Sequence, residues 1–232
     1  VGMTRSAAYR LVYTLAELGF LVRHPERKSY RLGPRVLSLG FAYLASQEVA
    51  EIARPHLEAL RDRTDCSAHL AVLDGTEIVY IARFADKKAL TSRITVGTRF
   101  PAHATSMGRA ILAQFPAEDV RRRFNGATLA RFSATTPTTV KALQSVLDAD
   151  RARGYVVSRS GFEAGIASVA APVFDADGAV VAAINISTPE STLSGNAIET
   201  TIKDQVVNSA KTISEWLGHR RRPTAERGSN NR

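Results

Sequence analysis

The sequence is poor in the residues that mark several classes of protein. Its 232 residues include one cysteine, one tryptophan and two methionines. The single cysteine, Cys66, excludes an internal disulfide and fits a reducing cytoplasm. No apolar run approaches the roughly 18 residues that indicate a membrane span, and no secretory signal peptide is visible. We therefore expect a cytoplasmic protein without a membrane-spanning segment.

Motifs of catalysis and metal binding are missing as well. The sequence holds no glycine-rich phosphate loop, no G-x-S-x-G elbow, no cysteine pair and no H-E-x-x-H. Cys66 and His69 offer a nucleophile and a base, but their odd separation would turn them to opposite faces of a strand. His56 and His103 stand alone, and lone histidines are more often structural than metal-binding. We expect no enzyme, no metal and no cofactor.

Positive charge is confined to the two ends of the chain. Residues 1–35 hold seven lysines and arginines against two acidic residues, and residues 218–232 hold five against one. Residues 36–217 hold 19 of each sign, so the net charge of +9 lies in the terminal segments. Basic charge on a small module indicates binding to a phosphate backbone. We expect the tail, 218–232, to be disordered.

The basic N-terminal segment predicts a helix and then a hairpin. The helix would run from Thr4, its N-cap, to Leu18, with Gly19 ending it. Two short strands, 20–24 and 29–32, would follow it. A basic helix before a basic hairpin is typical of a winged helix-turn-helix. The alternative is a solvated helix followed by an ordinary hairpin.

Two sets of side chains in this segment are candidates for DNA contact. The start of the helix would read bases, while the hairpin, with Arg35, would hold phosphates. Only three residues precede the helix, although a helix-turn-helix needs another helix there, so we expect a longer natural protein. The predicted DNA-binding residues are Thr4, Arg5, Ser6, Tyr9, Arg10, Arg27, Lys28, Tyr30 and Arg31.

The remaining pattern predicts an α+β fold with a largely antiparallel sheet. Asp74-Gly75 joins two strand-like runs in a hairpin. The predicted domains are 1–33, partial winged helix-turn-helix; 34–47, linker helix; 48–217, a larger domain; and 218–232, the tail. Helices are expected at 33–46, 48–64, 104–115, 117–124, 139–153 and 194–217, and strands at 67–73, 76–84, 90–96, 155–160, 166–174 and 179–187.

Two features of the larger domain indicate a ligand site. Small residues at 104–108 lead into a helix whose first N–H groups would be free to hold a carboxylate; the alternative is an ordinary N-cap at Thr105 or Ser106. Ser168, Asn185 and Ser187 interrupt apolar strands, and the last two share one sheet face. Buried polar groups need partners, so they either satisfy the backbone or line a cavity.

The chain resembles the IclR family of bacterial transcription regulators along essentially its whole length. The order and spacing of the matching stretches make the resemblance specific. Two further stretches, VGTRFP at 96–101 and TSMGR at 105–109, resemble the subgroup that regulates aromatic-acid and β-ketoadipate catabolism. The matching stretches are 5–33, HLAVLDG at 69–75, PAHAT at 101–105, GRA at 108–110, VAAPV at 169–173 and VAAINIS at 181–187.

The resemblance implies a winged helix-turn-helix, a linker helix and a GAF-like effector-binding domain, in a homodimer or a dimer of dimers. Some members hold an acidic residue where Ser158 stands here. Arg93, Arg99 and Arg109 are candidates to supply positive charge or to form structural ion pairs. The effector-binding residues that the resemblance implies are Leu90, Arg93, Ser106, Met107, Gly108, Ser158, Ser168, Asn185 and Ser187.

The leading hypothesis is a DNA-binding transcriptional regulator that senses a small carboxylate, with an aromatic acid or a related catabolic intermediate foremost. Its expected partners are double-stranded operator DNA, the carboxylate effector and a second copy of the chain. The alternative is a cytosolic small-molecule-binding protein, or a hydrolase using Cys66, with an incidental basic N-terminus.

Overall fold

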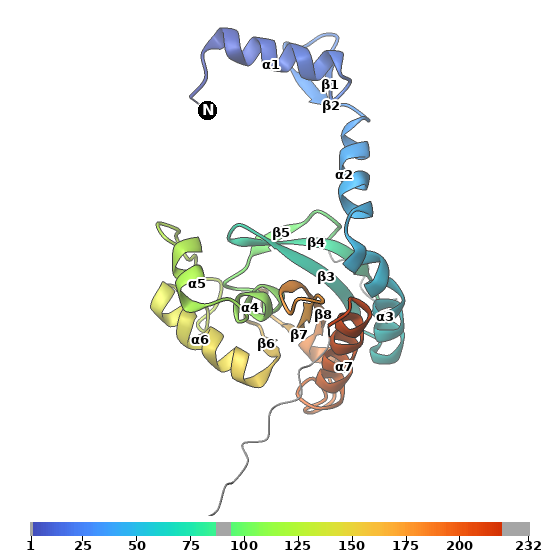
Figure 1. Ribbon diagram of the computed structural model, residues 1–232, viewed down its shortest axis with the longest axis vertical. Coiled ribbons are helices and arrows are strands. Elements are labelled where there is room, and N and C mark those ends of the chain that lie inside the picture. Colours follow the sequence, from blue (N-terminus) through green and yellow to red (C-terminus); the bar gives the residue numbers. More distant parts are fainter. Residues whose placement is uncertain (1, 87–93, 220–232) are drawn as a thin grey trace, which may run out of the picture. The chain divides into compact units, whose positions relative to one another are not determined.

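The computed structural model describes residues 2–86 and 94–219, which divide into two compact units, Val1–Glu48 and Val49–Arg232. Within these described ranges, no helix is both long and apolar enough to cross a membrane. Each unit has its own secondary structure and packing, shown in Figure 1.

The first unit holds the predicted helix and hairpin. Helix α1 spans Arg5–Glu17, and the Thr4 side chain caps it by accepting a hydrogen bond from the Ala7 N–H. Strands β1, Leu21–Arg23, and β2, Tyr30–Leu32, pair antiparallel. Helix α2, Val36–Ala45, completes the unit.

Close backbone packing joins the helix and the hairpin of the first unit. Gly33 donates its N–H to the Phe20 carbonyl, and a Cβ at Gly33 would lie 2.2 Å from the Gly19 carbonyl oxygen. Only glycine fits there. Arg35 donates to the Leu18 carbonyl at 3.0 Å and lies over the Phe20 ring. The exposed guanidinium of Arg35 thus joins helix α1 to the hairpin, and its predicted contact with phosphate stays a prediction.

The second unit is built on six antiparallel strands in the order β5-β4-β3-β8-β7-β6. Its α+β architecture matches the predicted fold class. The strands are β3, Ser67–Asp74; β4, Glu77–Phe84; β5, Arg99–Pro101; β6, Val156–Arg159; β7, Ile166–Phe174; and β8, Val180–Pro189. The helices are α3, Glu48–Thr64; α4, Ser106–Leu112; α5, Ala117–Arg123; α6, Val140–Arg153; and α7, Thr201–Trp216, with a short 3-10 helix at Glu190–Thr192.

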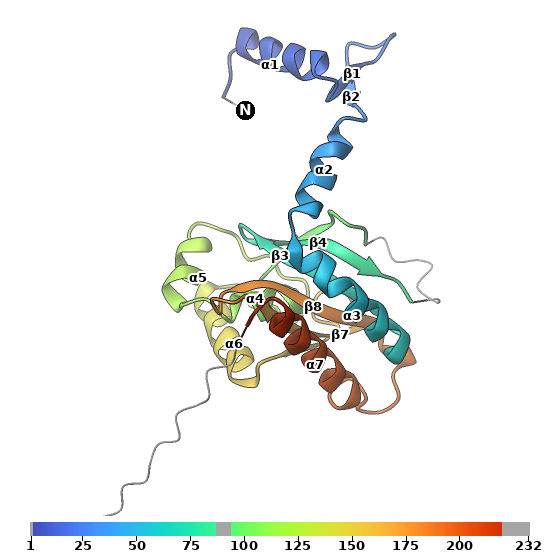
Figure 2. The ribbon, with the colours of Figure 1, turned by 45° about the vertical axis from the view of Figure 1, so that its right-hand side comes forward.

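Helices cover both faces of the sheet. Helices α3 and α7 lie side by side on one face, and α4 to α6 lie on the other (Figures 1 and 2). Arg63 of α3 donates to Ser209 of α7, which links the first pair of helices. On the other face Ala71, Ala170 and Ala183 form a core with Met107 of α4, among other residues. Alternation along each strand places small residues under α4, where the helix packs closely.

Three predicted elements differ from the structure. The predicted strand at 90–96 falls partly outside the described residues, and 94–96 are not in a strand. Strand β5 was not predicted; its three residues follow a turn at Gly97, whose φ is +88°. The final helix begins at Thr201 rather than near 194, because turns that include Gly195, at φ +51°, occupy the preceding residues.

A buried ion pair holds α4 against α6. Asp150 is 1% exposed, and Arg109 donates to both of its carboxylate oxygens, at 2.8 and 2.9 Å. Arg153 pairs with the same carboxylate. The geometry is bidentate, which fixes the relative orientation of the two helices as well as satisfying the charges.

We predict that Asp150→Asn destabilises the protein by about 3–5 kcal/mol, because it leaves Arg109 without its partner. Urea unfolding measures the change. Asp148→Asn, at an exposed position of the same helix, is the matched control and should change stability by less than about 0.5 kcal/mol. Equal stability of the two variants would contradict a structural role for the ion pair.

Candidate functional site

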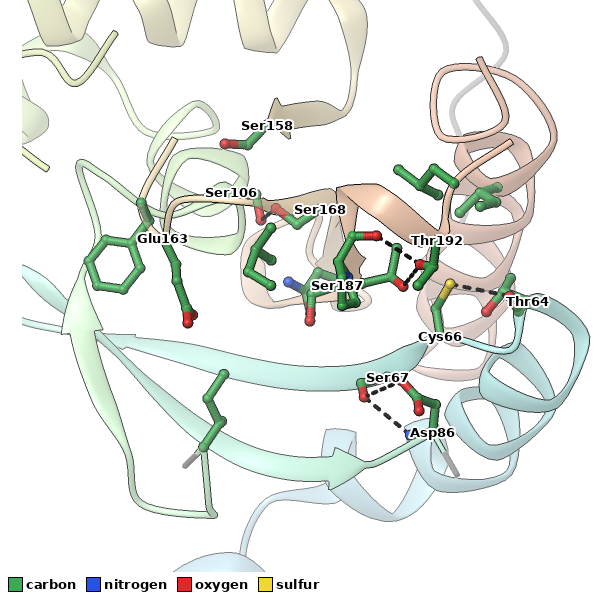
Figure 3. A pocket seen from close by; sticks show the side chains of 18 of the residues that line it. Thr64, Cys66, Ser67, Asp86, Ser106, Ser158, Glu163, Ser168, Ser187 and Thr192 are labelled. Atoms are coloured by element: carbon green, nitrogen blue, oxygen red, sulfur yellow. Dashed lines mark hydrogen bonds between the residues drawn. The ribbon is translucent and has the colours of Figure 1, made fainter. Parts of the chain in front are cut away.

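A cavity of about 1040 Å³ opens between the α4 side of the sheet and the surrounding loops. Its volume lies at the upper end of the roughly 300–1,000 Å³ usual for small-molecule pockets. Strands β3, β4, β6, β7 and β8 and the start of α4 all contribute to its lining, as do the turns after Ser160 and Pro189. Figure 3 shows the polar side chains that face it.

Four serines form a single row across the floor of the cavity. The strand register pairs Ser67 with Ser187, Ser187 with Ser168, and Ser168 with Ser158. Partners directly opposite in antiparallel strands share a face, so all four side chains lie on the cavity side. Ser168 also donates to Ser106 at the start of α4, 3.0 Å away (Figure 3). The result is a band of hydroxyl groups that can each donate or accept a hydrogen bond.

Aromatic rings border this band. Tyr80 and Phe100 lie edge to face with centroids 5.7 Å apart, and Phe100 lies 4.8 Å from Phe162. All three residues line the cavity. Ring faces beside hydroxyl groups suit a flat apolar ligand that carries a polar substituent.

The charged residues among the described lining of the cavity are acidic. Asp65, Asp86 and Glu163 line it, whereas no lysine or arginine does so within the described part of the chain. Asp86 is tied to Ser67, which accepts its backbone N–H and donates to its carboxylate. In Figure 3 Glu163 lies at the end of the cavity away from Cys66 and Thr64. Among the described lining residues, neutral hydrogen-bond donors are the groups that would hold a bound anion. At its own end of the cavity, the Glu163 carboxylate favours a ligand that carries a hydroxyl donor.

Thr105 is the N-cap of α4. Its hydroxyl accepts the Gly108 N–H at 3.3 Å, so that N–H is used within the protein. The N–H groups of Ser106 and Met107 lie in the first turn, where the helix itself offers no acceptor. A Cβ at Gly108 would lie 2.3 Å from Ala102, which explains why this position is a glycine.

The structure brings together most of the residues proposed to bind an effector. Ser106, Ser158, Ser168, Asn185 and Ser187 all line the cavity. Met107 and Gly108 do not: the Met107 side chain is buried in the core, and Gly108 packs against Ala102. Leu90 and Arg93 lie outside the described residues.

Sequence reasoning missed the aromatic border and Glu163. Tyr80, Phe100, Phe162 and Glu163 come from three separate segments, and each alone is an ordinary strand or turn residue. The two candidate cations among the described residues are engaged elsewhere: Arg99 pairs with Asp74 and Glu77, and Arg109 pairs with Asp150. For both arginines the structure shows a structural ion pair, which was one of the two roles that the sequence left open.

Cys66 and His69 do not form a nucleophile and base. Burial raises the pKa of the Cys66 thiol, which donates to the Thr64 carbonyl at 3.2 Å. A protonated, buried thiol is a poor nucleophile. His69 lies on β3, an interior strand of the sheet, and contacts Asn185 instead.

In the first unit, all nine residues predicted to contact DNA are exposed. Tyr9 and Tyr13 stack on the outer face of α1, with ring centroids 6.5 Å apart. Arg27 and Lys28 lie in the turn between β1 and β2. The basic groups are thus available at the helix start and at the tip of the hairpin.

Comparison with known proteins identifies the family. A family model described as the C-terminal part of the bacterial transcriptional regulator IclR matches residues 41–215, about three quarters of the chain. The chain belongs to the IclR family. Because this family and its curated relatives are transcriptional regulators, the prediction that the chain is not an enzyme is confirmed.

Relatives and solved IclR-family structures agree with this assignment. The Pca regulon regulatory protein of Pseudomonas putida is 38% identical over 185 residues, which cover 79% of this chain and 63% of that protein. The chain thus spans less than two thirds of that relative's length. The crystal structure of IclR from Thermotoga maritima is 30% identical, with a TM-score of 0.75 over 94% of this chain and 87% of that one. An IclR homologue from Microbacterium hydrocarbonoxydans, solved with 4-hydroxybenzoate, is 26% identical, with a TM-score of 0.75 over 93% and 86%.

We predict that His69 makes the stability of this IclR-family domain pH-dependent. Burial, with a smaller effect of Arg83, lowers the pKa of His69 to about 4 in the folded chain. As the pH falls, the unfolded state therefore binds a proton at a higher pH than the folded state does. The stability that neutral His69 provides is complete above about pH 6.5 and is lost as the pH falls towards 4. The expected loss is about 3 kcal/mol.

Unfolding of the wild type and of His69→Asn at pH 7 and pH 4 measures this contribution. The wild type should lose about 3 kcal/mol more than the variant, which lacks the titrating ring. Parallel losses in the two proteins would contradict the assignment.

Proposed function

We propose that this protein is a cytoplasmic DNA-binding transcriptional regulator whose effector is a small aromatic acid. The observation that carries the effector class is the serine row beside the rings of Tyr80, Phe100 and Phe162. The hydroxyls of the row and the first N–H groups of α4 would hold the carboxylate, and the rings would contact the aromatic face.

The relatives support this class of effector. The Microbacterium homologue binds 4-hydroxybenzoate, and the inducer-binding domain of the transcription factor PobR from Acinetobacter, 27% identical with a TM-score of 0.65, was solved as a double mutant with 3-hydroxybenzoic acid. Glu163 at the end of the cavity would accept the hydrogen bond of a ring hydroxyl. The cavity is larger than one benzene ring requires, so longer catabolic acids belong in the same test.

The first unit supports the DNA-binding half of the proposal. Its exposed basic residues lie on a helix and a hairpin in the order of a winged helix-turn-helix. Helix α2 exposes Leu37, Leu39 and Phe41 by 59% or more, so its apolar surface is available to a second copy in a dimer or a dimer of dimers. Effector binding would act by favouring one arrangement of two DNA-binding heads, which requires different affinities for the two arrangements.

We predict that one aromatic acid in a panel of small carboxylates raises the melting temperature of the purified chain. Ligand at about 100 times its Kd adds about 2.7 kcal/mol, on the order of 5–10 °C for a chain of this length. Ser106→Leu should abolish the shift by filling the cavity beside Ser168. Ser145→Leu, at an exposed position of α6 outside the cavity lining, is the control and should retain it. No shift with any acid would refute the effector class.

We predict distinct roles for Arg5 and Lys28 in DNA binding. Arg5→Ala should relax sequence preference, because a base contact is worth about 1–3 kcal/mol of discrimination. Lys28→Ala should weaken binding evenly on all sequences and reduce its salt dependence. Binding to operator and to random duplexes over a range of salt concentrations measures both. An even loss for Arg5→Ala would contradict the division of roles.

A further inference from the structure

A buried histidine contacts one of the polar residues of the cavity. His69 of β3 is 1% exposed and lies opposite Asn185 of β8 in the sheet. Its ring Nδ1 is 2.9 Å from the Asn185 Oδ1, and its ring lies edge to face with Tyr80 at 5.4 Å. Asn185 lines the cavity, whereas His69 is not among its lining residues.

The contact fixes which nitrogen of His69 carries the proton. The Asn185 Oδ1 is a carbonyl oxygen and only accepts, so Nδ1 must donate. Burial holds the pKa of the ring at about 4, so the ring is neutral at pH 7 and carries one proton. Its Nε2 is then an unprotonated acceptor, and it has no partner among the described residues.

The same contact fixes the Asn185 amide. With Oδ1 turned to His69, the amide NH₂ is the group left for the cavity, and no hydrogen bond joins it to another described residue. Asn185 shares its sheet face with Ser187, two residues along β8, so the NH₂ adjoins the serine row. An amide free to rotate would offer its oxygen or its nitrogen in turn.

We propose that His69 is a positioning residue that locks the Asn185 amide with its NH₂ towards the ligand. The locked amide makes this part of the cavity a donor, selective for an acceptor such as a carboxylate oxygen. This matters because the described cavity lining is acidic, and a donor held in place lowers the cost of ordering on binding. The inference rests on the proposed function for the ligand, while the lock itself is a property of the free protein.

Three variants separate positioning from simple packing. His69→Leu removes the donor and keeps apolar bulk, while His69→Asn restores an N–H close to the position of Nδ1. His103→Leu is the matched control: His103 is 3% exposed and also has a ring nitrogen hydrogen-bonded, to the Ala130 carbonyl at 3.0 Å, but it does not line the cavity.

The binding experiment uses 4-hydroxybenzoate as the probe. His69→Leu and Asn185→Ala should each weaken binding roughly tenfold, the usual effect of one lost hydrogen bond to a charged group. His69→Asn and His103→Leu should bind as the wild type does. In the double variant His69→Leu/Asn185→Ala the two losses should not add, because they remove one interaction. Unchanged binding by His69→Leu, or additive losses, would overturn the proposal.

A second experiment needs no ligand. Long-range ¹H–¹⁵N spectra of wild-type protein with labelled histidine should show the Nδ1–H tautomer for His69, assigned by its loss in His69→Asn. The Nε2–H tautomer at His69 would overturn the proposal whatever the binding assays show. If no acid binds the wild type while the Nδ1–H tautomer is present, the proposed effector class is wrong. The proposal that His69 orients the Asn185 amide is then still supported.

Discussion

The pairing register of β3, β8, β7 and β6 is the constraint on which the site depends. Because side chains alternate along a strand, a shift of one residue in any pair would turn its serine away from the cavity and its neighbour towards it. Large buried residues hold the register: Ile184 and Ile186 alternate with Asn185 and Ser187 along β8. The apolar face of the sheet thus positions the polar one.

The two faces of the six-stranded sheet are covered by different helices and differ in what lies between sheet and helices. The α3 and α7 side is packed with apolar side chains, whereas the α4 side combines a core with an open cavity. The short helix α4 packs closely because the sheet beneath it carries alanines, and because Gly108 has no side chain to separate it from Ala102. The buried Asp150 carboxylate fixes α6 against α4, and so holds the start of α4, with Ser106, over Ser168.

Polar groups around the cavity differ in how far the protein satisfies them. Ser67 is engaged with Asp86, and Ser106 with Ser168, while the Asn185 amide is half engaged through His69. A small molecule that supplies acceptors to the remaining donors, and a hydroxyl to Glu163, would satisfy groups that are otherwise left to water. A partly satisfied polar cavity of this kind suits an effector site, because binding energy comes from hydrogen bonds that the protein does not make alone.

The sequence by itself determined most of the local structure: helices from period and caps, the hairpin at Asp74-Gly75 from its turn residues, and basic ends from charge. It missed strand β5, which is only three residues long. It also indicated that Asn185 and Ser187 share a face, since a spacing of two is local. Only the tertiary structure decided which strands are neighbours, because register depends on residues a hundred positions apart, such as His69 and Asn185. For the same reason the aromatic border, the locked amide and the partners of Arg99, Arg109 and Arg35 followed from the fold alone.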